Sequence, residues 1–173
     1  MKHKRVTVLL VLMAIVLLVI PAVAQSSKAS YTIIACEIEQ IDPGTAWVSG
    51  DNVLHFRNEV VVHEVHSDEP LLQGRNRVTR SGDINLSTGR AHIYGSFDYQ
   101  VTGVNGAWDG RFTIQAEPGL PYWGNGTAQG KGDLAGMTQK IQFAPLPPDY
   151  PNNPCVDAAT TGMHMVTIID HSK

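Results

Sequence analysis

The chain has 173 residues, of which 43% are hydrophobic, and it carries 13 Lys and Arg residues against 16 Asp and Glu residues. Beyond residues 2–5 the basic side chains are scattered, which argues against nucleic acid or an anionic membrane as a partner. After Ala24 there is no sustained helical periodicity, whereas period-two alternation recurs, so the pattern predicts an all-β protein.

The first element along the chain is a targeting segment. Residues 1–5 are basic, residues 6–20 form an unbroken apolar run, and residues 21–24 supply a small-x-small cleavage site. We expect cleavage after Ala24 and a secreted or periplasmic protein that is free of the membrane afterwards. An uncleaved anchor is the alternative, although the apolar run is shorter than the roughly 20 residues that span a bilayer. The predicted division is therefore a signal peptide, 1–24, and a single domain, 25–173.

Two cysteines follow the targeting segment, Cys36 near the start of the domain and Cys155 near its end. In an oxidising compartment such a pair is expected to form one disulfide; two free thiols are the alternative. A loop of this length gives roughly 4–5 kcal/mol of stabilisation in the chain-entropy model. The disulfide also requires the two ends of the domain to meet.

The rest of the domain reads as strands joined by short turns. Alternation is clearest in 91–101, in 108–116 and around Ile141 and Phe143. A bulge or break is expected at Asn58, and a proline-rich segment, 145–155, is expected to cover one end of the fold. Eight or nine strands predict a sheet that closes on itself. The less regular strands are expected at 31–39, 53–66, 74–86 and 162–170.

A glycine-rich run, 122–137, is the most specific feature of the chain. Its five glycines all occupy even positions, so one face of an extended strand there carries almost no side chains. Such a face is typical of a sharp bend, a barrel corner or a backbone crossed by another side chain. The run does not match a phosphate-binding loop, because Gly130-Lys131 is followed by Gly132 rather than by Ser or Thr.

Histidines and methionines offer two weak metal hypotheses. His55, His63 and His66 lie along one predicted strand, but their spacing matches no standard site, and we interpret them as polar strand positions. The triplet Met163-His164-Met165 contains soft ligands, yet on a strand the methionines face away from the histidine. Core packing of both methionines is the preferred interpretation. No metal or cofactor is expected.

The sequence contains no recognised catalytic motif, so the catalytic residues stay unknown. Glu37, Glu59 and Glu64 lie on predicted strands, and any of them that faced the interior would be a candidate general base. The sequence does not determine which of the three points inward.

The glycine-rich hairpin resembles that of the allene oxide cyclase and dirigent β-barrel superfamily, in which G-x-G, a hydrophobic residue and another glycine lead into an alternating strand. Further similarity to exported bacterial domains of this type lies in Trp47, 53–57, 67–74 and 106–112. The resemblance implies a closed, calycin-like antiparallel β-barrel of about eight strands, with a lumen for an apolar small molecule, often in a homo-oligomer. No catalytic residue is carried over from the family.

These observations lead to three functional hypotheses. The first is an exported β-barrel that binds a small hydrophobic ligand in its lumen without catalysis. The second is a cyclase- or isomerase-type enzyme that uses a lumen carboxylate. The third is a cell-surface interaction module, which would display an exposed apolar patch.

Overall fold

The described part of the chain is an all-β structure of nine antiparallel strands. The computed structural model describes residues 26–145, 153–155 and 161–171, and within these ranges the only helical element is a short 3-10 helix, η1 (Pro70–Leu72). The strands are β1 (Ser27–Asp42), β2 (Thr45–Val48), β3 (Val53–His66), β4 (Gly74–Asn85), β5 (Ala91–Val101), β6 (Gly106–Ala116), β7 (Trp123–Gly132), β8 (Met137–Pro145) and β9 (Thr161–Asp170).

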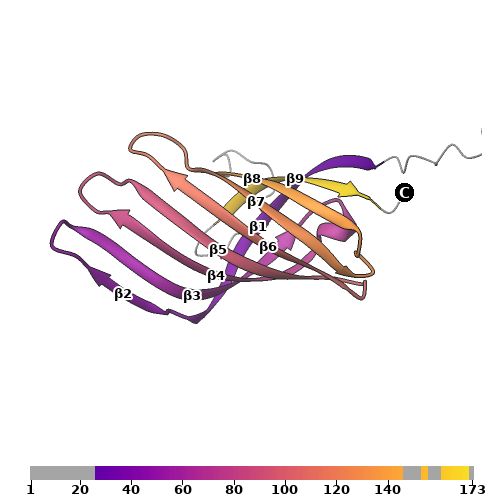
Figure 1. Cartoon of the computed structure of the whole chain (residues 1–173), viewed down its shortest axis with the longest axis horizontal. Coiled ribbons are helices and arrows are strands. Elements are labelled where there is room, and N and C mark those ends of the chain that lie inside the picture. Colours follow the sequence, from indigo (N-terminus) through magenta and orange to yellow (C-terminus); the bar gives the residue numbers. More distant parts are fainter. Residues whose placement is uncertain (1–25, 146–152, 156–160, 172–173) are drawn as a thin grey trace, which may run out of the picture.

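Eight of these strands form a ring. Their order is β1-β9-β8-β7-β6-β5-β4-β3, and β1 also pairs with β3, so that the sheet returns to its first strand. The strand β2 lies outside the ring and pairs with β3 alone (Figure 1). The prediction of an all-β antiparallel sheet is therefore confirmed.

The strands form where apolar and polar residues alternate, because alternate side chains then share the buried face. In β5, Phe97, Tyr99 and Val101 are buried while the residues between them are exposed. In β6, Trp108 and Phe112 lie on the corresponding face. These side chains belong to one apolar core inside the ring.

A bulge in β3 changes the face that each of its residues presents. Asn58 has a φ of 58°, and the register with β4 shifts between Phe56 and Glu59. Before the bulge, Phe56 pairs with Gly82 on the inner face; after it, the odd-numbered residues Val61 and Val65 enter the core. The bulge predicted at Asn58 is confirmed, and its effect is to aim the second half of β3 inward.

The predicted disulfide is present. Cys36 and Cys155 are bonded, with their Cα atoms 5.2 Å apart and a sequence separation of 119. Both pack with Ile34 in a small cluster separate from the main core, on the face of β1 opposite Ala35. The bond therefore attaches the segment before β9 to the outer face of β1.

Several sequence predictions lie outside the described residues. These are the signal peptide with its cleavage site and most of the proline-rich segment, of which residues 145 and 153–155 are described. Within the described ranges we find no helix whose length and apolar character would allow it to cross a bilayer.

Candidate functional site

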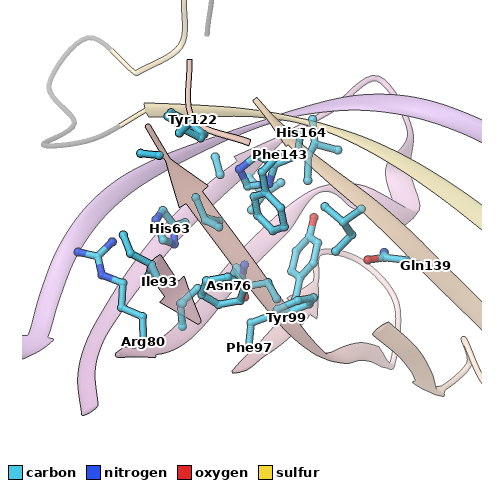
Figure 2. Close-up of a pocket in the computed structure, with 18 of the residues that line it drawn as sticks. His63, Asn76, Arg80, Ile93, Phe97, Tyr99, Tyr122, Gln139, Phe143 and His164 are labelled. Carbon is cyan, nitrogen blue, oxygen red and sulfur yellow. The ribbon is translucent and has the colours of Figure 1, made fainter. Parts of the chain in front are cut away.

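The interior of the ring contains a cavity of about 330 Å³ (Figure 2). Side chains from β1, β3, β4, β5, β6, β8 and β9 line it, and most of them are apolar. The large aromatic and aliphatic side chains in the wall include Ile93, Phe97, Phe112, Ile114, Ile141 and Phe143. The cavity is therefore suited to an apolar molecule.

Glycines make room for the aromatic rings that form the cavity wall. Phe97 of β5 pairs with Gly110 of β6, and Phe112 of β6 pairs with Gly95 of β5. A Cβ atom at Gly110 would overlap the Phe97 ring, and one at Gly95 would lie 2.9 Å from the Phe112 ring. Because glycine has no side chain, each ring lies across the neighbouring backbone instead of projecting into the cavity.

The glycine-rich strand β7 has the same role on the other side. Its inner face carries Gly124, Gly126, Ala128 and Gly130, as the sequence pattern predicts. A Cβ atom at Gly126 would lie 3.2 Å from the ring of Phe143, and one at Gly130 would overlap the backbone and side chain of Leu134. The bare face therefore accommodates neighbouring side chains, which is one of the explanations expected from the sequence.

One end of the ring, which we name the packed end, is filled by side chains. Trp108 and Leu72 are fully buried, Leu134 is 1% exposed, and the Trp108 Nε1 donates a hydrogen bond to the Leu71 carbonyl at 3.1 Å. Leu72 belongs to η1, and Leu134 lies in the connection between β7 and β8, both of which lie at this end (Figure 1). These two leucines close the ring at the packed end.

The opposite end, which we name the cavity end, has smaller residues facing inward. Ala91 begins β5, Ala116 ends β6, and both line the cavity. Tyr122 also lines it and donates a hydrogen bond from its hydroxyl to the Ala144 carbonyl at 2.9 Å. These short side chains leave the cavity end unfilled. The equivalent space at the packed end is filled by Trp108, Leu72 and Leu134.

An ion-pair network lies beside the cavity. Arg80, which lines the cavity, donates to Glu59 at 2.6 Å and to Glu37 at 3.0 Å, and Gln40 donates to Glu59 at 2.5 Å. Burial favours the neutral form of Glu59, but the hydrogen bond from Arg80 and its positive charge have the larger effect. Together they lower the pKa of Glu59. The Glu59 carboxylate is therefore held ionised.

The structure decides which predicted carboxylates face inward. Glu37 is 8% exposed and Glu59 is half-buried, and both reach Arg80. Glu64 is exposed on the outer face of β3. The sequence leaves this choice open because the alternation in β1 and β3 does not identify the inner face.

Two histidines line the cavity. His63 is placed by β3 with its Nε2 3.8 Å from Glu37, and burial and the charge of Arg80 lower its pKa to about 4 although Glu37 opposes the shift. The ring of His164 lies 4.4 Å from that of Phe143, and burial, together with His63, lowers its pKa to about 3. Both imidazoles are neutral at neutral pH.

The position of His164 corrects one sequence prediction. His164 faces the cavity, whereas Met165 is 53% exposed on the outer face of β9. Core packing of both methionines is therefore wrong for Met165; the side chain of Met163 lies outside the described residues. The predicted alternation of Met165 and His164 holds, but the inner face of β9 carries His164.

The three histidines considered as metal ligands are separated by the fold. His55 lies before the bulge on the outer face, where its Nδ1 is 2.7 Å from Asp83 and its ring stacks on Trp47. His63 faces the cavity, and His66 ends β3. Trp47 and residues 53–57, on which the family resemblance partly depends, do not line the cavity.

Sequence reasoning missed a second set of polar residues in the cavity. Asn76 of β4, Tyr99 of β5 and Gln139 of β8 line it together with the apolar side chains (Figure 2). Burial raises the pKa of Tyr99. The only sequence signal for these residues is that alternation places each on one particular face of its strand. That signal is useful only when the inner face of the strand is known.

Neither the scan of protein-family models nor the search of curated proteins found a significant match to this chain. The fold and the cavity define the class of structure: an antiparallel sheet with an eight-strand ring around a mostly apolar interior cavity.

Proposed function

We propose that this chain is an exported, closed antiparallel β-barrel of the allene oxide cyclase and dirigent-like type that binds a small apolar molecule in its lumen without converting it. The observation that carries the proposal is the interior cavity of about 330 Å³ lined by Phe97, Phe112 and Phe143. Small-molecule sites have volumes of roughly 300–1,000 Å³ and mostly apolar linings. The disulfide fits an oxidising compartment, which supports export.

The geometry of the wall supports binding as the role of the cavity. Core side chains normally fill the interior of a small domain to high density. Here Gly95 and Gly110 let two phenylalanine rings lie against the backbone, and Ala91 and Ala116 leave the cavity end unfilled. The same strands are tightly filled at the packed end, so the cavity is a local property of one end.

The test is ligand binding by protein that has been stripped of bound lipid. A panel of small hydrophobic compounds is screened by thermal shift and by native mass spectrometry, and at least one is expected to raise Tm and to remain bound. Ile114→Trp fills the cavity and is expected to abolish binding. Gln115→Trp places the same side chain one residue away on the outer face of β6 and is expected to leave binding intact. No binding by any compound would contradict the proposal.

An isomerase that uses an interior carboxylate is the second candidate. The observation in its favour is that Glu37 and Glu59 face inward beside the cavity-lining Arg80. It receives less support because Arg80 pairs with both carboxylates and lowers the pKa of Glu59, whereas a carboxylate that transfers protons near neutral pH needs a raised pKa. Product analysis of the bound compounds tests it: turnover that is lost in Glu37→Gln while binding persists would favour the enzyme.

A further inference from the structure

Four buried polar atoms of residues that line the cavity have no hydrogen-bond partner among the described residues. They are the His63 Nδ1, the Asn76 Oδ1, the Tyr99 hydroxyl and the Gln139 Nε2. Tyr99 and Gln139 are each 2% exposed, and Gln139 is among the largest fully buried side chains. Buried polar atoms in folded proteins nearly always have a partner, because an unmade hydrogen bond is costly away from water. Four such atoms in one mostly apolar cavity point to a polar group on the bound molecule.

Three of these side chains, Asn76, Tyr99 and Gln139, lie at the inner part of the cavity, toward the packed end. Asn76 and Tyr99 are paired across β4 and β5, and on its other side Tyr99 is paired with the fully buried Trp108. Figure 2 shows Asn76 and Gln139 on either side of Tyr99, whose hydroxyl points toward the part of the cavity that holds Phe143. We name Asn76, Tyr99 and Gln139 the polar floor.

The chemistry of the polar floor identifies the group that it would bind. Asn76 offers an acceptor, Gln139 offers a donor, and the Tyr99 hydroxyl is both. A hydroxyl group can donate, as the Asn76 acceptor requires, and can accept, as the Gln139 donor requires. A ketone can only accept, and a hydrocarbon would leave all three atoms without partners.

Charge argues against an anionic group. Among the described residues that line the cavity, Arg80 carries the permanent positive charge, and its guanidinium already binds Glu37 and Glu59. A carboxylate on the ligand would enter an apolar cavity whose one cation is neutralised, and it would lie near two negative charges. Burying an unpaired charge costs far more than burying a hydrogen-bonded neutral group.

We propose that the ligand is an uncharged alcohol or phenol, whose hydroxyl is bound by Asn76, Tyr99 and Gln139 while its apolar body lies against the phenylalanine wall. This inference rests on the proposed binding function and specifies its ligand class. Phe97, Phe112 and Phe143 supply contact area, and the polar floor sets the orientation of the molecule.

Three probes of one shape test the inference: naphthalene, naphthol and naphthoate. Their affinities for the lipid-stripped protein are measured at neutral pH by calorimetry and by ligand fluorescence. Naphthol is expected to bind roughly tenfold more tightly than naphthalene, and naphthoate is expected to bind most weakly. Equal affinities for naphthalene and naphthol would overturn the inference but leave the binding function standing. No binding by any probe would overturn both.

Variants locate the effect at the polar floor. Tyr99→Phe removes one hydroxyl and Gln139→Met replaces one amide, and each is expected to reduce the naphthol preference severalfold while naphthalene affinity stays the same or rises. Tyr94→Phe makes the same chemical change on the outer face of β5 and is expected to leave every affinity unchanged. Tyr99→Phe removes a buried hydroxyl that has no protein partner, so the variant is expected to fold and to carry the test if Gln139→Met does not. A naphthol preference that survives both variants would contradict the assignment.

Discussion

The packed end and the cavity end are built by the same strands and differ in what fills them. At the packed end Trp108, Leu72 and Leu134 are at most 1% exposed, and two of these three side chains come from outside the ring strands. At the cavity end Ala91 and Ala116 face inward and a space of about 330 Å³ remains. A ring of strands therefore creates an interior, but the connections and the strand ends determine whether it is core or cavity.

This difference separates stability from binding within one small domain. The packed end has the contacts that a well-filled core provides, whereas the cavity end gives up such contacts to leave room for a ligand. Substitutions at the two ends are therefore expected to affect different measurements.

The largest expected effect is at the packed end. Trp108→Ala is expected to lower the free energy of unfolding by about 3–5 kcal/mol, because it leaves a void and removes the hydrogen bond to Leu71. Ile114→Ala at the cavity end enlarges an existing space and is expected to cost less than about 2 kcal/mol. Urea denaturation measures both, and equal losses would remove the distinction between the ends.

The disulfide is expected to stabilise both ends together. A Cys36→Ala, Cys155→Ala double variant is expected to lose about 4 kcal/mol of unfolding free energy, because a long loop in the unfolded chain is no longer closed. The bond lies in a cluster separate from the main core, so the folded fraction is expected to retain ligand binding. As a control, thiol titration of unfolded, unreduced wild type should detect no free sulfhydryl; two reactive thiols would contradict the prediction.

Acid is expected to weaken the cavity end through its histidines. Because the pKa of His63 is lowered to about 4 and that of His164 to about 3, the unfolded chain binds protons below about pH 6.5 that the folded chain does not. Their contribution is present above pH 6.5 and is lost as pH falls, by about 1.4 kcal/mol per pH unit for each histidine.

Urea denaturation between pH 6.5 and pH 5 measures this slope, in a range above the ordinary pKa of carboxylates. His63→Gln is expected to remove about half of it. His92→Gln changes an exposed histidine on the outer face of β5 and is expected to leave the slope unchanged. A slope that is the same in all three proteins would contradict the prediction.

The smallest expected effect is on the outer face of β3. Glu64→Gln is expected to change the free energy of unfolding by less than about 0.5 kcal/mol, because Glu64 is exposed. Glu37→Gln weakens the ion pair with Arg80 beside the cavity and is expected to cost more. Equal effects in thermal denaturation would mean that the inner and outer positions are not distinguished energetically.

Much of the fold could be predicted from local patterns. The alternation in 91–101 and 108–116 indicated β5 and β6, and Asn58 indicated the bulge in β3, since these signals depend on a few neighbouring residues. The short strand β2 was missed because all four of its residues are exposed and it has no buried face to generate a pattern.

The site was harder to predict because alternation shows which residues share a face of a strand but not which face is the inner one. The sequence placed Met165 and His164 on opposite faces of a strand, yet only the ring shows that His164 faces inward and that Met165 is exposed. The same ambiguity concealed the polar floor, since Asn76, Tyr99 and Gln139 are unremarkable until three strands bring them to one cavity.

The sequence by itself determined the all-β class, the two-faced strands, the bare face of the glycine run and the cysteine pair that the structure joins. These properties follow from residue spacing and from the types of residue present. The tertiary structure alone decided which face is interior, which carboxylates meet Arg80 and where the interior is left unfilled. Such properties depend on the register of strands distant in sequence, which the pairing of β1 with β3 fixes when the ring forms.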